Sequence, residues 1–113
     1  MPDKKEKFNE EVMEVQAESA TLETDGVACM SMLPSDIIQE NILRKNPSRG
    51  IKISKGGDGY VIDVFVVVRF GCRIPETAWN IQENVKKRVQ ESTGAQVNKV
   101  NIHIEGVKPN GEN

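Results

Sequence analysis

The feature that most constrains this chain is the run from Tyr60 to Phe70, in which apolar residues occupy every second position. Successive side chains of a strand point to opposite faces, so this alternation predicts a long strand with one apolar face. The apolar face carries Ile62, Val64, Val66, Val68 and Phe70. The opposite face is mixed and carries Val61, Asp63, Phe65, Val67 and Arg69. One face is therefore expected to pack in a core. The other face mixes apolar and charged side chains and is only partly compatible with exposure to solvent.

Two further strands are predicted beside this one. Ile51 to Ser54 alternates with period two, and the glycine-rich segment 55–59 that follows is typical of a hairpin turn. Val100, Ile102 and Ile104 alternate with polar residues in a last strand that Gly106 closes. The chain holds 13 Val and 10 Ile against 3 Leu, which disfavours a purely helical bundle.

Two principal helices are expected. The first begins at Asn9, a good N-cap, and ends near Asp25–Gly26. Its expected apolar stripe of small side chains consists of Val12, Val15, Ser19 and Leu22, with Met13, Ala17 and Ala20 beside them. The second is opened by Pro75 and ends at Thr93–Gly94. Its buried stripe consists of Ala78, Ile81, Val85 and Val89. A third, shorter helix could begin at Ser35 and must end before Asn46–Pro47.

These elements predict an α+β fold: a three-stranded mixed sheet with two main helices packed on one face, in the order α-β-β-α-β. The long strand–helix–strand connection favours a last strand parallel to the central one. A chain of 113 residues is one domain. We expect a flexible N-terminal segment over 1–8, a single domain over 9–107 and a polar tail over 108–113.

Composition excludes several classes of protein. There are 15 basic and 17 acidic residues, so the excess of positive charge typical of nucleic-acid binders is absent. No apolar run approaches the roughly 20 residues of a membrane span, and the charged first residues are not a signal peptide. Cys29 and Cys72 match no zinc or redox spacing and are interpreted as reduced thiols of a cytoplasmic protein.

Several segments together resemble one family. They are Gly26-Val27 followed by Met30, the stretches 44–53 and 62–68, Ile74-Pro75-Glu76 continuing through 81–86, Thr93-Gly94, and the stretch 100–107. In this order and spacing they are similar to the bacterial alkaline shock protein family, also described as YloU-like or envelope stress response proteins. The resemblance spans residues 12–107.

The resemblance implies a non-enzymatic, cytoplasmic protein linked to cell-envelope stress. Some relatives self-associate, and some sit at the membrane through a partner that carries the transmembrane helices. The implied partners are therefore further copies of the chain and a membrane-anchored protein, with no direct insertion into the membrane.

Catalytic and metal-binding constellations are not found in the sequence. His103 is the single histidine and shares a strand face with Glu105, which would give two ligands of a metal site without a third. The segment 56–59 lacks the Lys-Ser/Thr of a phosphate-binding loop. We therefore expect no enzyme activity, no metal and no cofactor.

The mixed face of the central strand is the candidate binding surface. Apolar side chains ringed by charged ones are typical of an interaction patch. Its expected members are Lys52, Val61, Asp63, Phe65, Val67, Arg69 and His103. Either this face docks a partner or a second copy, or the first helix or a terminal segment covers it. An alternative function is a small RNA-binding module in which Phe65 stacks a base on the open sheet.

Overall fold

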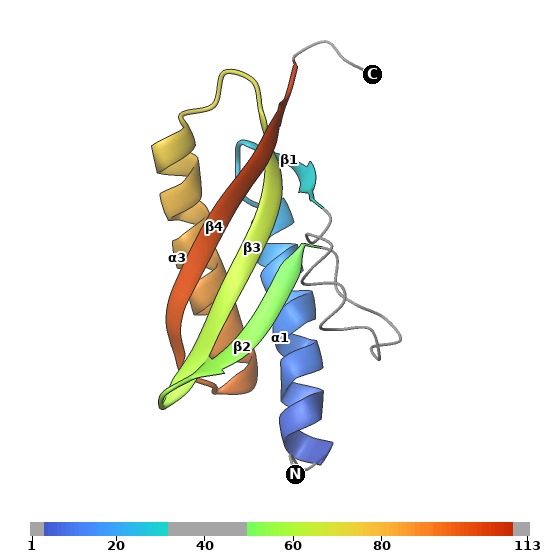
Figure 1. Ribbon diagram of the computed structural model, residues 1–113, viewed down its shortest axis with the longest axis vertical. Helices are drawn as coiled ribbons and strands as arrows, with labels where there is room; N and C mark the ends of the chain where they lie inside the picture. Colours follow the sequence, from blue (N-terminus) through green and yellow to red (C-terminus); the bar gives the residue numbers. More distant parts are fainter. Residues whose placement is uncertain (1–3, 32–49, 110–113) are drawn as a thin grey trace.

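The structure is a computed structural model that describes residues 4–31 and 50–109, with side chains described from Glu10 onward. Its elements follow the order α1, β1, β2, β3, α3 and β4 (Figure 1). Their bounds are α1 Lys4–Leu22, β1 Val27–Met30, β2 Ile51–Gly56, β3 Gly59–Arg69, α3 Ile74–Thr93 and β4 Val97–Lys108. The fold is α+β, and the sheet has four strands rather than the three that were expected.

Strand β3 is the centre of the sheet. Strand β2 pairs antiparallel with the first half of β3, from Gly56↔Gly59 to Ile51↔Val64. Strand β1 pairs antiparallel with residues 66–68, near the other end of β3. Strand β4 pairs parallel with β3 from Tyr60 to Arg69, which confirms the parallel last strand and makes the sheet mixed.

Strand β1 was not among the expected strands. It has four residues, and its pairing with β3 is irregular, with a register shift between Val27 and Cys29. Only its pairing with β3 makes it a strand. Such pairing depends on residues that are distant in the sequence.

Both helices pack on the apolar face of the sheet, and Figure 1 shows them behind the strands. The core joins four β3 side chains to side chains of α1 and α3. The β3 members are Ile62, Val64, Val66 and Val68, and the helical members are Met13, Ala17, Ala20, Ile81, Val85 and Val89. The predicted stripe of α3 is confirmed at Ile81, Val85 and Val89, with Thr77 as its other buried residue.

The stripe predicted for α1 is confirmed in part. Val15 is 59% exposed and Leu22 is 49% exposed, whereas Met13, Ala17 and Ala20 are buried. Two buried threonines complete the packed side of this segment: the hydroxyl of Thr21 donates to the Ala17 carbonyl, and that of Thr24 donates to the Ala20 carbonyl. Because their hydroxyls are bonded locally, these polar residues are buried at little cost.

The ends of the helices also differ from expectation in part. Helix α1 begins at Lys4 rather than at Asn9 and ends at Leu22. Helix α3 has Pro in its first turn and Gly94 as its C-cap, as predicted. The short helix expected from Ser35 lies outside the described residues. The domain limits 9–107, with a flexible segment before them and a polar tail after them, stay a prediction.

Candidate protein-interaction surface

The seven candidate residues lie on one side of the sheet, opposite the helices. We call this set of side chains, Lys52, Val61, Asp63, Phe65, Val67, Arg69 and His103, the open face. The strand register places Lys52 of β2 beside Asp63 and His103 of β4 beside Phe65, on opposite sides of β3. In the part of the chain that the structure describes, the helices α1 and α3 both pack on the other face.

A hydrogen-bonded cluster forms the middle of the open face. The Nε2 atom of His103 lies 2.9 Å from Oδ1 of Asp63, and the amide of Asn101 donates to the same oxygen at 3.1 Å. The His103 ring stacks on the Phe65 ring, with centroids 4.2 Å apart and planes 9° from parallel. Asp63 therefore holds two side chains of β4 against β3, and His103 is positioned from two sides.

Phe65 contributes little accessible surface to this face, because it is only 5% exposed. One face of its ring is already occupied by His103. An aromatic side chain that stacks an RNA base needs an accessible ring face. The geometry around Phe65 therefore does not favour the RNA-binding alternative.

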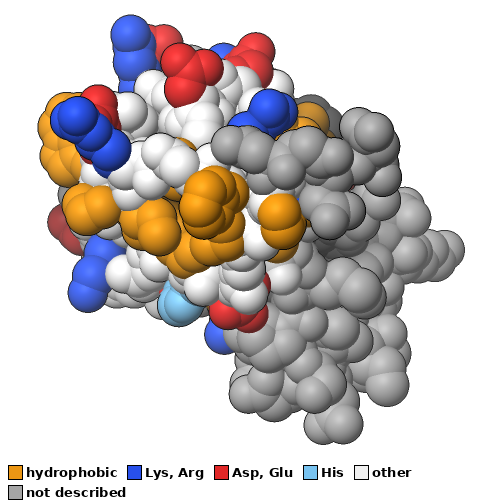
Figure 2. Space-filling model, turned by 90° about the horizontal axis from the view of Figure 1, so that it is seen from above, with side chains coloured by type: hydrophobic (Ala, Val, Ile, Leu, Met, Phe, Trp, Pro, Cys, Tyr) orange, Lys and Arg blue, Asp and Glu red, His pale blue; other side chains and the backbone are white. Residues whose placement is uncertain are grey.

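The accessible apolar surface lies instead at the end of the sheet where β3 and β4 finish. Phe70 is 63% exposed, Val107 is 47% exposed and Ile74 is 41% exposed. Figure 2 looks onto this end and shows hydrophobic side chains gathered across it, with a histidine beside them. The alternation predicted Phe70 on the core face of the strand. Strand β3 ends at Arg69, so Phe70 leaves the pattern.

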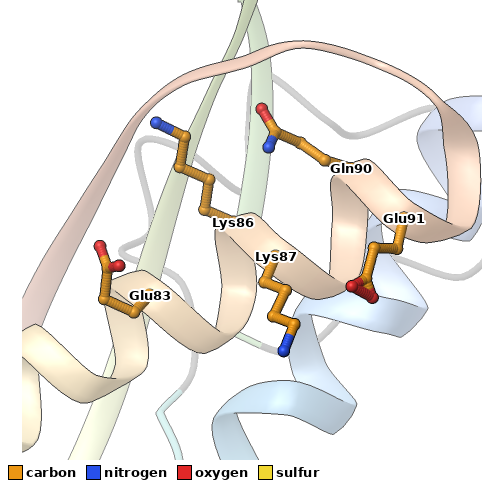
Figure 3. Close-up of a pocket in the computed structure, with 5 residues that line it drawn as sticks. All are labelled: Glu83, Lys86, Lys87, Gln90 and Glu91. Carbon is orange, nitrogen blue, oxygen red and sulfur yellow. The ribbon is translucent and has the colours of Figure 1, made fainter.

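The exposed side of α3 is charged. An open groove along it is lined by Glu83, Lys86, Lys87, Gln90 and Glu91 (Figure 3). In this view Lys86 and Gln90 project toward β4, and Lys87 and Glu91 project toward α1. Arg88 of α3 forms an ion pair with Glu23. The groove is wide, polar and open to solvent, and it lacks the apolar enclosure of a small-molecule site.

Chemistry-bearing groups do not converge elsewhere in the described ranges. Within residues 4–31 and 50–109, no three His, Cys, Asp or Glu side chains gather in a way that could hold a metal ion. Cys29 and Cys72 are both free, the first exposed and the second partly buried. Among the helices described, none is long and apolar enough to cross a membrane.

Known structures and sequences resemble this chain over most of its length. A solved structure of a MamM CTD variant superposes with a TM-score of 0.50, covers 86% of this chain and 96% of its own, and shares 14% identity. At that identity the likeness concerns the fold alone.

Sequence relatives are more similar. The uncharacterized protein YqhY of Bacillus subtilis (strain 168) is 39% identical over 98 residues, which cover 87% of this chain and 73% of YqhY. The uncharacterized protein YloU of the same strain is 31% identical over 103 residues, which cover 89% of this chain and 86% of YloU. The model of the alkaline shock protein 23 family, described as having a cell envelope-related function, matches residues 2–109. This chain is therefore a member of the alkaline shock protein 23 family, the YloU-like family that its sequence resembles.

Proposed function

We propose that this protein is a non-catalytic, cytoplasmic component of the cell-envelope stress response that acts through protein contacts made by its open face. The contacts are with further copies of the chain or with a membrane-anchored partner. The family to which the chain belongs has a cell envelope-related function. The contacts, the compartment and the absence of catalysis are our proposal.

One observation carries the proposal: within the described ranges, the whole helical layer lies on one side of the sheet. A single-sided sheet that combines apolar and charged side chains is typical of a binding surface. Val61 and Val67 are partly buried on this side, and the charged Arg69 is exposed. The bonds that Asp63 makes with Asn101 and His103 keep the face ordered before any partner binds. Such pre-ordering lowers the entropic cost of association.

The test is the substitution Val67→Asp. Val67 is a partly buried residue of the open face and is not part of the core cluster, so the variant is expected to fold. Phe65 is less suitable, since a charge at a residue that is 5% exposed would perturb folding. We expect Val67→Asp to reduce species larger than a dimer in light scattering, and to reduce capture of membrane-anchored protein from native cells whose membrane fraction is retained.

The matched control is Val15→Asp, the same chemical change at a residue of α1 that is 59% exposed. It should leave the mass distribution and the captured proteins as in the wild type. If Val67→Asp and the wild type gave the same mass distribution and the same captured proteins, the open face would not be the docking surface.

A further inference from the structure

The outer edge of β4 is the longest strand edge that the described strands leave unpaired. Of these strands, β4 pairs with β3 alone, and it runs for 12 residues. The amides of Tyr60 in β3 and of Phe70, the residue after β3, donate to the carbonyls of Gln96 and Lys108, whereas the amide of Phe65 donates to Gly50 on the other side. Even-numbered residues of β3 therefore bond toward β4. With the observed register, the amides of residues 99, 101 and 103 then point to β3, and those of Val100, Ile102 and Ile104 point to the outer edge.

Side chains of α3 occupy only the first part of this edge. Gln90 accepts a hydrogen bond from the backbone amide of Val97, and Gln82 donates to the carbonyl of Val100 at 3.0 Å. The second contact confirms that the Val100 carbonyl points outward. Ile102 and Ile104 follow it, and both are only partly buried against the core. An edge of this kind is a template for pairing with another strand.

The sequence of β4 is complementary to itself when it is read in the antiparallel direction about Ile102. Pairing Ile102 with the same residue of a second copy sets Val100 opposite Ile104. It also sets Lys99 opposite Glu105, twice, because the arrangement is two-fold symmetric. Lys99 and Glu105 are both exposed. Shifting the two-fold axis by one residue, to His103, would set Lys99 opposite Val107 and lose both ion pairs.

We propose that two copies of this chain associate through their β4 edges, antiparallel about Ile102, to form one continuous sheet across the dimer. The pairing adds main-chain hydrogen bonds at Val100, Ile102 and Ile104. The Val100 carbonyl keeps its bond from Gln82, because a carbonyl oxygen has two lone pairs. Opposite charges at cross-strand positions fix the register.

Trp79 supports the same contact. It lies on the α3 stripe that continues through Gln82, Lys86 and Gln90, at spacings of three and four residues. Gln82 and Gln90 of this stripe contact β4, so the stripe runs beside the outer edge. Trp79 is nevertheless 59% exposed. An exposed tryptophan beside an unpaired edge is the residue type that most often dominates an interface.

Charge reversal tests the proposed register. Lys99→Glu or Glu105→Lys alone replaces two attractive pairs by two repulsive ones, and each is expected to weaken the dimer at least about tenfold in sedimentation or light scattering. An equal mixture of the two single variants should form heterodimers in which both pairs are attractive. The double variant Lys99→Glu, Glu105→Lys should dimerise like the wild type.

Two measurements locate the contact independently of affinity. The amides of Ile102 and Ile104 should exchange with deuterium slowly in the wild-type dimer and rapidly in either single variant. Trp79 is the only tryptophan in the chain, so its emission should shift to shorter wavelength as the wild-type protein is concentrated.

The proposal is overturned if the wild type is monomeric at all concentrations, if the single variants dimerise like the wild type, or if their mixture does not recover the dimer. A dimer whose Ile102 and Ile104 amides exchange freely would also overturn it. The edge contact does not rest on the open face: Val67→Asp should leave the dimer intact. Failure of either proposal is therefore distinguishable from failure of the other.

Discussion

At the scale of single residues, the open face is organised by a few polar contacts. Asp63 accepts from Asn101 and lies against His103, and His103 stacks on Phe65. The observed register brings these residues together, since positions 63 and 65 of β3 lie opposite positions 101 and 103 of β4. The exposure of Phe65 could not be predicted in the same way, because it depends on all atoms that approach the ring.

Gly26, directly before β1, is expected to tolerate substitution poorly. Its φ is +96°, and an added Cβ would lie 2.7 Å from Oγ1 of Thr77. Gly26→Ala should lower the free energy of unfolding by about 1–3 kcal/mol, from backbone strain and overpacking together. Urea denaturation measures this loss.

Gly57 is the matched control for Gly26. Its φ is also positive, at +67°, but an added Cβ would meet nothing within 4 Å. Gly57→Ala should therefore cost only the conformational part, about 1 kcal/mol. Equal losses for the two variants would show that crowding against Thr77 does not contribute.

At the scale of elements, the apolar residues of α1 divide between the core and the surface. The sequence predicted a stripe with Met13, Ala17 and Ala20 beside Val15 and Leu22, and the fold buries the first three and exposes the last two. The packed side is made of Met13, small alanines and threonines, which let α1 lie close to α3. Hydrogen bonds from threonine hydroxyls to carbonyls four residues earlier make this possible, and hydropathy does not record them.

Thr24 is expected to connect the two helices. Its hydroxyl donates to the Ala20 carbonyl and accepts from the side-chain amide of Asn84 at 2.9 Å. Thr24→Val should lower the free energy of unfolding by about 1 kcal/mol, the net value of a lost hydrogen bond. Thr21→Val is the control, because the hydroxyl of Thr21 bonds to Ala17 of its own helix. A loss for Thr21→Val as large as that for Thr24→Val would contradict the proposed link.

The buried stripe of α3 can be tested with two isoleucines of the same helix. Ile81 is fully buried and Ile74 is 41% exposed. Ile81→Ala should cost about 2–5 kcal/mol through lost burial and a cavity, and Ile74→Ala should cost much less. Thermal or urea denaturation compares the two variants. Similar losses of unfolding free energy would contradict the assignment of Ile81 to the core and Ile74 to the surface.

At the scale of the whole molecule, within residues 4–31 and 50–109, the helices lie opposite the open face of the sheet, and the other described strands leave the outer edge of β4 unpaired; we propose both as contact surfaces. The first lies across the strands and the second lies along one of them, so both could be used in one assembly. Edge pairing would give a dimer, and the open faces of that dimer would then be available for larger species or for a membrane-anchored partner.

Salt should distinguish the edge contact from an apolar one. Because the proposed register has two exposed ion pairs, raising ionic strength should weaken the wild-type dimer by a few-fold through screening. Raising ionic strength should instead strengthen the dimer of Lys99→Glu, since salt then screens two repulsions. Analytical ultracentrifugation at low and high salt measures both trends. A dimer whose affinity follows the same trend in both proteins would not be held in the Lys99–Glu105 register.

The sequence by itself determined the central strand, the α3 helix with its caps, the parallel last strand and the family. The helix and strands depend on local periodicity and turn residues, and the family depends on several segments that match its sequence pattern in order and spacing. Only the tertiary structure decided that Val27–Met30 is a strand, that Val15 and Leu22 of α1 are exposed and that Phe65 is buried while Phe70 is exposed. These properties depend on which distant atoms approach each residue, and a pattern along the chain contains no information about such distances.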